Sequence, residues 1–348
     1  MTKQKLMQLA AGGAVGAGLA GVATAAVAVG AYRAWARRGY ALTGKTVLIT
    51  GGSRGLGFAT AREFLRCGCR VALCARDAGE LERARQRLQA LGDVMTIALD
   101  LAEPGSAAAA VAAVEQAWGP VDVLAHVAGI ISLGPWQAMS DDDFQRAMDV
   151  HCWAALRLAR AVLPAMIQRG SGRIVNVSSI GGLVPVPHML PYTVSKFALV
   201  GLSEGLASEV RRHGVRVGCV CPFLTRTGSQ ERVELKGDHE SEFAWFAAAG
   251  SLPGLSQSAQ HAARAIVHAC RRGRALTVLT LPGKLAAWVH GLAPSATAEA
   301  MSMAERLLPA SPGPGGQHAR LGRDSYNAFT ARAVKPLIHR SGRDLNQA

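Results

Sequence analysis

Short apolar runs alternate with amphipathic segments from Lys45 to about Thr280. Seven runs rich in β-branched and aliphatic residues are predicted as strands, at 46–50, 70–75, 94–99, 121–125, 173–178, 216–220 and 275–280. The segments between them have helical periodicity, and Ser140 with Asp143 forms a capping-box pattern at the start of one. This regular alternation predicts a single α/β domain with a doubly wound parallel sheet of about seven strands. Ligands of such a sheet bind at the carboxyl ends of the strands.

The first predicted strand runs directly into a glycine-rich turn, Thr50-Gly-Gly-Ser-Arg-Gly-Leu-Gly57, and then into a helix. Glycines allow the backbone to turn sharply and to approach a ligand closely. The helix that follows directs free N–H groups and its positive dipole end into the turn, which favours a phosphate. Strand, turn and helix in this order predict dinucleotide binding, and the alternative is a tight turn without a ligand.

Residues 6–32 contain no charged side chain and consist mostly of Ala and Gly. A helix of this length spans about 40 Å, more than the roughly 30 Å of a hydrocarbon core. Three interpretations compete: a membrane anchor, a cleaved signal peptide and a flexible leader. The length of the segment and the cations that follow it, Arg33, Arg37 and Arg38, favour an uncleaved transmembrane anchor at 1–32 and a basic linker at 33–44.

Three further segments adjoin the predicted catalytic domain, which covers 45–282. Residues 228–255 interrupt the strand–helix alternation with exposed aromatic residues, as a substrate lid does, and the alternative is an ordinary packing helix. Residues 283–308 are predicted as two apolar helices broken near Pro294, which cap the sheet or rest on a membrane surface. Residues 309–348 carry six Lys or Arg against two Asp and are predicted to form a flexible basic tail.

Composition restricts the class of partner. The formal net charge is +14, so nucleic-acid binding has to be considered. No nucleic-acid module or basic–aromatic stripe accompanies the dispersed cations, however. Basic clusters beside an apolar segment fit anionic lipid headgroups better. The seven cysteines show neither a C-x-x-C pair nor a neighbouring His at metal-ligand spacing. We therefore predict reduced thiols, no metal site and no nucleic-acid partner.

The end of the second predicted strand indicates which dinucleotide binds. Folds that prefer NAD usually present a carboxylate there to the adenosine ribose, whereas this strand ends in Ala75 followed by Arg76. A second guanidinium, that of Arg54, lies in the glycine turn. Two cations without an acid suit the dianionic 2′-phosphate of NADP. Asp100, at the end of the third strand, can accept a hydrogen bond from the adenine amino group.

A candidate catalytic set follows the fifth strand. Tyr192 and Lys196 are spaced four residues apart on a predicted helix, so the phenol and the ammonium share one face. A nearby cation favours the phenolate and lowers the tyrosine pKa. Ser179, just past a strand end, can hydrogen-bond a substrate carbonyl while Tyr192 moves the proton.

These motifs resemble the short-chain dehydrogenase/reductase family, closely from Gly44 to about Thr227 and weakly on to Thr280. The resemblance rests on Thr50-Gly-Gly-Ser-Arg-Gly-Leu-Gly57, Asp100-Leu101, His126-Val-Ala-Gly129, Ser179, Tyr192-xxx-Lys196 and Pro222-Phe-Leu-Thr-Arg-Thr227. It implies a Rossmann fold and cofactor contacts from Gly51, Ser53, Arg54, Gly55, Leu56, Gly57, Arg76, Asp100, Leu101, Ala128, Gly129, Tyr192, Lys196, Pro222, Thr225 and Thr227. In the family's mechanism the tyrosine is the general acid/base and the serine orients the carbonyl. The lysine lowers the tyrosine pKa and binds the nicotinamide ribose.

Three residues depart from the family pattern. His126 replaces the first Asn of the usual Asn-Asn-Ala-Gly turn, which puts the bracing of the central sheet in doubt. His151 replaces the Asn that is the fourth catalytic residue, and either keeps its backbone carbonyl role, joins the proton relay through its imidazole, or is an inert buried residue. Phe223 replaces a Gly beside the nicotinamide, where it crowds the pocket or adds an apolar wall.

The leading hypothesis is therefore an NADP-dependent oxidoreductase on a single-pass membrane anchor, with its catalytic domain facing the NADPH-rich cytoplasm. The anchor, the aromatic insertion and the apolar helices indicate a hydrophobic carbonyl or alcohol substrate. The resemblance also implies a homo-dimer or homo-tetramer, because helices of this fold form such faces in the family. The alternative is a non-catalytic NADP-binding sensor or scaffold at the membrane, which the three substitutions would fit.

Overall fold

The computed structural model describes residues 39–251, 256–311 and 313–347. The predicted anchor at 1–32 and residues 33–38 of the predicted basic linker lie outside the described residues, as does part of the predicted lid, 252–255. Residues 42–348 form one compact unit, and the description below concerns this unit.

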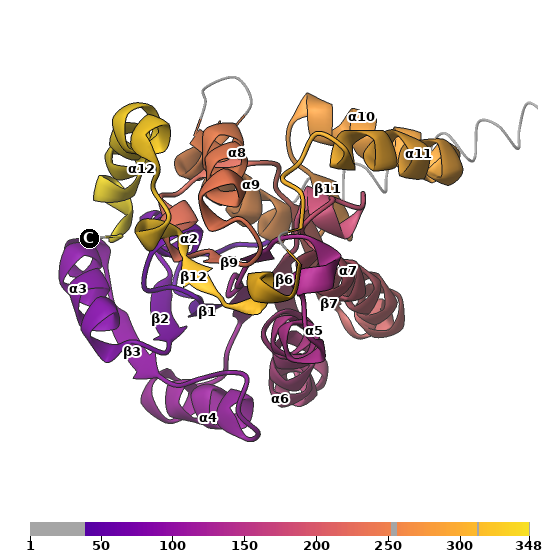
Figure 1. The fold of residues 1–348 in the computed structure, drawn as a ribbon. Coiled ribbons are helices and arrows are strands. Elements are labelled where there is room, and N and C mark those ends of the chain that lie inside the picture. The colour runs from indigo at the N-terminus through magenta and orange to yellow at the C-terminus, as the bar shows by residue number, and fades with distance from the viewer. Residues whose placement is uncertain (1–38, 252–255, 312, 348) are drawn as a thin grey trace, which may run out of the picture. The chain divides into compact units, whose positions relative to one another are not determined.

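A single sheet of seven parallel strands forms the centre of the unit, in the order β11-β7-β6-β4-β1-β2-β3 (Figure 1). The strands are β1 (Thr46–Thr50), β2 (Arg70–Ala75), β3 (Val94–Ala98), β4 (Val123–His126), β6 (Gly172–Val177), β7 (Val215–Cys221) and β11 (Leu276–Val278). All seven strands predicted from the sequence are present, with ends that differ by at most two residues. The prediction of a doubly wound parallel sheet is confirmed.

The order of the strands reverses at β1. From β1 the chain proceeds to β2 and β3 on one side, and then crosses to β4, β6, β7 and β11 on the other. Thr50, the last residue of β1, pairs with Cys74 of β2 and with His126 of β4. The loops that leave the carboxyl ends of β1 and β4 therefore diverge and open a crevice, which is where ligands bind in open α/β sheets.

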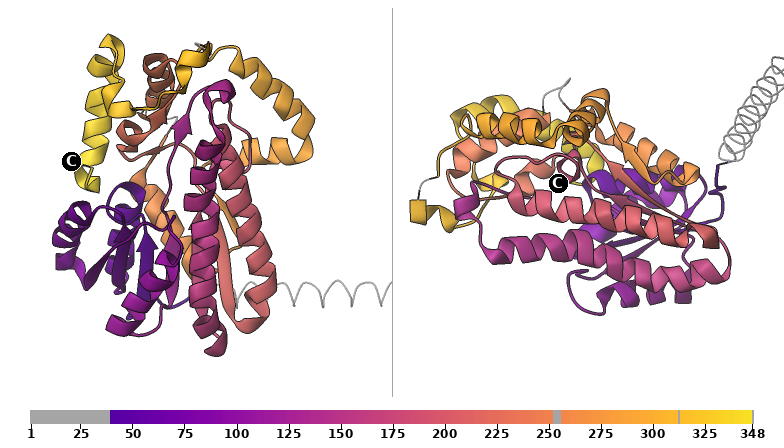
Figure 2. Two further views of the ribbon diagram at one scale, coloured as in Figure 1. Left: turned by 60° about the horizontal axis from the view of Figure 1, so that its bottom comes forward. Right: turned by 90° about the vertical axis from the view of Figure 1, so that its right-hand side faces the viewer.

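Helices cover both faces of the sheet (Figures 1 and 2). They are α2 (Gly55–Arg66), α3 (Ala78–Leu88), α4 (Ser106–Trp118), α5 (Asp141–Met148), α6 (Ala154–Gln168), α7 (Leu190–Val210), α8 (His239–Ser251), α9 (Ala259–Arg272), α10 (Leu281–Leu292), α11 (Pro294–Glu305) and α12 (Lys335–Gly342). Helices α4, α6 and α7 contribute to one continuous core with side chains of the strands, among them Leu48, Leu124 and Val217. On the other face α2 packs against α9. Both faces of the strands are thus buried, as their nearly continuous apolar sequences require.

A second layer lies over the carboxyl ends of the strands. It contains α8 and a small sheet in the order β12-β9-β5, formed by Arg320–Leu321, Glu234–Leu235 and Ser132–Leu133. A further short pair joins β8 (Thr225–Arg226) to β10 (Gln257–Ser258). The sequence predicted exposed aromatic residues in this region, but Phe243 and Phe246 of α8 are buried. They form a core with Leu133, because α8 is covered on its outer side by the C-terminal segment.

The C-terminal segment is not the flexible tail that the sequence predicted. Its described residues supply β12 and α12, and Val334 and Ile338 are buried against the aromatic residues of α8. The rings of Tyr326 and Phe243 meet edge to face with their centroids 4.8 Å apart. Burial of these few apolar side chains outweighs the polar, basic composition that suggested disorder.

Helices α10 and α11 meet at Pro294, as the sequence predicted, and extend from the body of the unit (Figures 1 and 2). Apolar side chains on one face of α10 form an exposed stripe, in which Trp288 is 72% exposed and Leu292 is 87% exposed. Leu281, Leu285 and Val289 continue the same stripe. Among the described residues, the helix that is long and apolar enough to cross a membrane is a different one, Asp141–Gln168, and half of its apolar window is buried in the fold.

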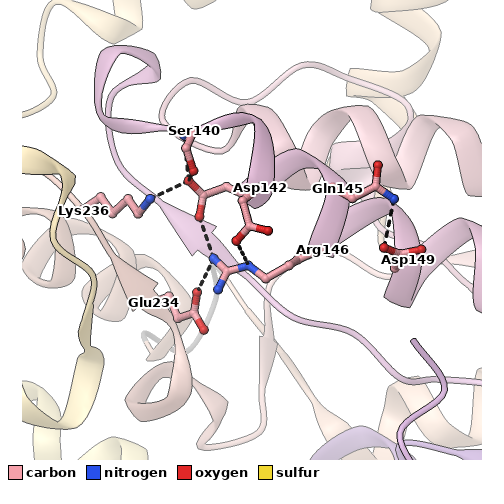
Figure 3. A network of polar contacts seen from close by, with 8 residues as sticks. Ser140, Asp142, Gln145, Arg146, Asp149, Glu234 and Lys236 are labelled. Atoms are coloured by element: carbon pink, nitrogen blue, oxygen red, sulfur yellow. Dashed lines mark hydrogen bonds and ion pairs between the residues drawn. The ribbon is translucent and has the colours of Figure 1, made fainter. Parts of the chain in front are cut away.

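A network of polar contacts connects α5 to the second layer (Figure 3), and the buried carboxylate of Asp143 belongs to it. Asp143 completes the predicted capping box with Ser140 and is 1% exposed. It lies 2.5 Å from Lys236 Nζ and 2.6 Å from Arg146 Nη2, and the same guanidinium reaches Glu234 of β9 at 3.1 Å. Burial acts to raise the pKa of Asp143, but the hydrogen bonds from Lys236 and Ser140 outweigh it and hold the pKa below its usual value.

We expect Asp143→Asn to lower the free energy of unfolding by about 3 kcal/mol, because the substitution leaves the buried Lys236 ammonium without its anion. Asp142→Asn is the matched control, since that carboxylate is 74% exposed and pairs with the same Arg146, so its loss should change stability by less than about 1 kcal/mol. Urea unfolding at pH 7 measures both. The pKa of Asp143 is depressed, so its contribution is present above the unfolded pKa and is lost as the pH falls through the folded pKa. Equal effects of the two substitutions on the free energy of unfolding would contradict the role of Asp143 as the buried anion that pairs with Lys236.

Candidate active site

The three predicted catalytic residues converge at the carboxyl edge of the sheet. Ser179 follows β6, and its Oγ accepts a hydrogen bond at 3.1 Å from the backbone N–H of Gly181. Tyr192 and Lys196 lie in the first turns of α7. Pro191 is the second residue of this helix, where its missing N–H is harmless. A Cβ at Gly181 would lie 3.2 Å from Tyr192 Cε1, so glycine there lets the tyrosine ring approach the Ser179 turn.

Tyr192 is a neutral phenol in this structure. Burial raises its pKa to about 12, although a hydrogen bond with the Ser179 side chain acts in the opposite direction. The sequence predicted a pKa lowered by Lys196, whose ammonium lies 5.7 Å from the centre of the Tyr192 ring, but burial dominates and the pKa is raised instead. The protonated hydroxyl is the form that can donate a proton.

Lys196 is held below Tyr192 by the end of β6. Its side chain is buried, and Nζ donates to the carbonyl of Val177 at 3.0 Å. Burial lowers the pKa of Lys196 to about 8, so the residue still carries a positive charge near neutral pH. One of the three ammonium donors is used by Val177, which leaves donors for a ligand.

His151 lies in a π-helical turn, Asp149–Trp153, between α5 and α6. Its Nε2 accepts from the backbone N–H of Ile130 at 3.1 Å, which places the ring proton on Nδ1, and Nδ1 then donates to Ser195 Oγ at 2.8 Å. Ser195 in turn donates to carbonyls of the first turn of α7, including that of Tyr192. Burial, with the charge of Lys196, holds the pKa of His151 well below its usual value. The imidazole is neutral, and both its nitrogens are occupied.

His126 braces the sheet where the family pattern has an Asn. Its Nδ1 accepts from Thr50 Oγ1 at 2.9 Å, and its Nε2 donates to the carbonyl of Val150 at 3.1 Å. Thr50 Oγ1 also accepts from the backbone N–H groups of Val127 and Ala128. Burial and the charge of Lys196 lower the pKa of His126 to about 3, so the ring is neutral. The bracing that the sequence placed in doubt is supplied by the histidine.

Close packing within the turn after β1, and of this turn against the loop after β4, requires glycine at two positions. A Cβ at Gly57 would lie 2.0 Å from the Gly51 carbonyl oxygen, and one at Gly51, where φ is +65°, would lie 2.7 Å from Ala128 Cα. The helix that follows, α2, begins at Gly55 without a side-chain cap and without an acidic residue in its first turn. Its first N–H groups are thus available to an anion.

The cations beside the turn, Arg54 and Arg232, pair with a carboxylate that was not predicted from the sequence, that of Glu80. The Arg54 guanidinium lies 3.2 Å from a Glu80 carboxylate oxygen, and Arg232 reaches the other oxygen at 2.8 Å. Ser53 Oγ donates to the same carboxylate at 3.0 Å. Burial and the charge of Arg232 lower the pKa of Arg54. Arg76 stands apart, 68% exposed and 3.8 Å from Asp100. Asp77-x-x-Glu80, a helix-capping pattern, was the available signal for Glu80.

The remaining predicted cofactor residues line the same edge. Asp100 caps the loop after β3 by accepting from the N–H of Ala102 at 3.0 Å. Thr225 and Thr227 follow β7, and their hydroxyls bond to the Phe223 carbonyl and to Ser229. The others that the structure brings to this edge are Leu56, Leu101, Ala128, Gly129 and Pro222. The Phe223 ring packs toward Gly283 at the start of α10.

Apolar side chains of the second layer pack beside Tyr192. Ile131, Val186 and Trp245 are partly buried against the core that contains Phe243 and Phe246. The loop before α7 is fastened to α8 by His188, whose Nδ1 lies 2.6 Å from Glu242 and whose backbone adopts φ +60°. No group of metal-ligating side chains occurs in the part of the chain that the structure describes.

Known proteins are similar to this chain in amino-acid sequence. The family profile described as short chain dehydrogenase matches residues 45–237. Oxidoreductase UcpA from Escherichia coli K12 is 37% identical over 201 residues, which are 57% of this chain and 76% of that protein. Gluconate 5-dehydrogenase from Gluconobacter oxydans is 33% identical over 195 residues, which are 56% and 76% of the two chains.

Solved structures agree with this assignment. L-sorbose reductase from Gluconobacter frateurii, complexed with NADPH and L-sorbose, superposes with a TM-score of 0.62 at 28% identity over 68% of this chain and 95% of that one. A metagenomic short-chain oxidoreductase in complex with NADP gives a TM-score of 0.56 at 29% identity over 69% and 97%. With more than half of its length matched by the family profile, the chain belongs to the short-chain dehydrogenase/reductase family and is one of its oxidoreductases.

Proposed function

We propose that this oxidoreductase uses NADP(H) to interconvert a hydrophobic carbonyl compound and its alcohol. The observation that carries the proposal is the convergence of Ser179, Tyr192 and Lys196 beside the glycine turn, with Tyr192 protonated. This arrangement supplies a proton donor, a hydrogen-bond donor for a carbonyl oxygen and a buried cation. A non-catalytic sensor or scaffold has no need of these three groups together.

The residues around the turn fit NADP. The uncapped first turn of α2 offers N–H groups to a phosphate, and Arg76 is exposed and not closely paired. Arg54 and Arg232 add positive charge, partly neutralised by Glu80. No carboxylate stands at Ala75, where NAD-preferring folds usually present one. The NADPH and NADP complexes of the two structural relatives support the same choice.

In reduction, the Tyr192 hydroxyl donates its proton to the carbonyl oxygen of the substrate, and the Ser179 hydroxyl donates a second hydrogen bond to that oxygen. When bound, the cofactor supplies the hydride. Lys196 places a positive charge near the oxygen that becomes phenolate, so it favours transfer of the proton. His151 holds the Ile130 loop and the first turn of α7 in register, which makes it a positioning residue in this proposal.

The apolar surroundings of Tyr192 support a hydrophobic substrate. Ile131, Val186 and Trp245 are the partly buried side chains on that side, and Phe223 adds a ring where the family usually has glycine. The exposed apolar side chains of α7 and of the π-helical turn before α6, such as Phe197 and Trp153, support a homo-oligomer, because such faces are commonly covered by a second copy.

Residues 6–32 and the exposed stripe of α10 support attachment to a membrane, with the catalytic unit in the cytoplasm, where NADPH is available. The expected result for an integral anchor is that full-length protein stays with the membrane fraction after washing with alkaline carbonate and is released by detergent. Release by carbonate would instead show that the attachment is peripheral.

We expect Tyr192→Phe to lower kcat for NADPH-dependent carbonyl reduction by at least about 100-fold, because the proton donor is lost. The dissociation constant for NADPH should change by less than about twofold, since the phenyl ring is kept. Tyr326→Phe is the matched control, because that hydroxyl bonds to Glu231 in the second layer. Reduction of a panel of apolar ketones and aldehydes, followed by NADPH absorbance, measures kcat. Unchanged turnover by Tyr192→Phe would refute the mechanism.

The role of His151 is tested with two substitutions. His151→Ala removes both ring contacts and should lower kcat about 10-fold through misplacement of Tyr192, whereas His151→Gln keeps a donor and an acceptor and should recover part of the loss. Neither should move the pH profile of kcat. A shift of one pH unit or more would show that the imidazole itself relays protons.

Unfolding provides a second measurement for His151. The folded imidazole stays neutral, so below pH 6.5 the unfolded chain binds a proton that the folded chain does not, and stability falls as the pH is lowered. We expect His151→Gln to reduce this fall between pH 7 and pH 5.

A further inference from the structure

The end of the chain reaches the glycine turn. After α12, a short 3₁₀ turn, Arg343–Leu345, leads to Asn346, which adopts the left-handed conformation at φ +57°. Asparagine tolerates this conformation better than most residues, and here it directs Gln347 back toward the sheet. Leu345 and Asn346 are only 5% and 4% exposed.

Two carboxamide side chains fix this end in place. Asn346 Nδ2 donates to the backbone carbonyls of Ser53 and Glu80, at 2.7 and 3.0 Å. Gln347 Oε1 accepts from Arg54 Nη1 at 3.2 Å, and its Nε2 donates to the Thr227 carbonyl at 3.0 Å. Both residues therefore bind the segments that the proposed function assigns to the cofactor.

The Gln347 side chain fills the space that the turn leaves open. A Cβ at Gly55 would lie 3.1 Å from Gln347 Nε2, which is the nearest atom to it outside the turn. On the opposite side the same amide group bonds to the Thr227 carbonyl. The carboxamide thus bridges Arg54 and Gly55 to Thr227. A phosphate held by the first turn of α2 and by Thr227 has to occupy this gap.

The rest of the segment remains anchored when the end moves. Ile338 of α12 is buried in the second layer, and Gly342 packs on Gly228 so closely that a Cβ on Gly228 would lie 2.9 Å from its Cα. Beyond Gly342, Arg87 donates to the Arg343 carbonyl at 3.0 Å, Asp344 interacts electrostatically with Arg62, and Asn346 and Gln347 make the contacts described above. Displacing the end from the turn therefore leaves α12 in place.

We propose that residues 343–347 form an autoinhibitory segment, which occupies the phosphate position of the dinucleotide site and is displaced when NADP(H) binds. The inference rests on the proposed function, since it takes NADP(H) as the ligand of this site. Docking of the segment and binding of the cofactor are mutually exclusive, so each weakens the other by the same factor. The apparent affinity for NADPH equals the intrinsic affinity multiplied by the fraction of molecules with an open site.

The test is a chain that ends at Leu345, made by a stop codon in place of Asn346. It retains α12 and loses both carboxamides, so we expect the dissociation constant for NADPH to fall at least about 10-fold relative to the full chain. Arg332→Gln, a change at an exposed position before α12, is the control and should leave the dissociation constant within about twofold. Titration of NADPH fluorescence measures all three proteins.

Hydrogen exchange gives a reading that does not depend on activity. If NADPH displaces the segment, backbone amides at 343–347 of the full chain exchange faster when the cofactor is bound, whereas those of α12 do not change. An unchanged or increased dissociation constant in the shortened chain, or slower exchange with NADPH, overturns autoinhibition and leaves the cofactor assignment intact. Absence of NADPH binding by both chains overturns the cofactor assignment and this inference with it.

Discussion

The hydrogen bonds that converge on Thr50 and His126 hold the site together. Through them the end of β1 is joined to the end of β4, to the loop that carries Ala128, and to the π-helical turn at Val150. The next residue in that turn, His151, extends the connection through Ser195 to the helix that carries Tyr192. One neutral histidine, His126, thus braces the crevice where the strand order reverses, and a second, His151, is connected through Ser195 to the helix of Tyr192, the proposed proton donor. Their neutrality is a condition of the arrangement, because a protonated Nδ1 on His126 could not accept from Thr50.

Much of this architecture could be predicted from the sequence because it depends on local patterns. The seven strands of the main sheet follow from runs of buried aliphatic residues, and the break between α10 and α11 follows from Pro294. The positions of Ser179, Tyr192 and Lys196 at one edge follow from the rule that parallel strands present their carboxyl ends together. The short strands of the second layer could not be predicted, since two-residue strands such as β9 have no periodicity to detect.

Contacts between distant parts of the chain could not be predicted from such local patterns. Glu80 neutralises Arg54 together with Arg232, and Gln347 reaches Arg54 across a separation of 293 residues. The aromatic residues of α8 were expected to be exposed because the segment that covers them is polar on average. The pKa of Tyr192 was predicted in the wrong direction for a related reason: the spacing to Lys196 was read correctly, but burial was not visible in the sequence.

The Phe223 ring has a mechanical consequence. It contacts the first turn of α10 at Gly283, and it belongs to the same short stretch as Thr225 and Thr227 on the cofactor side. The outer face of α10 is apolar and exposed to solvent. A molecule that covered the α10 stripe would therefore bear on a helix whose first turn lies beside the Phe223 ring, at the start of the stretch that follows β7.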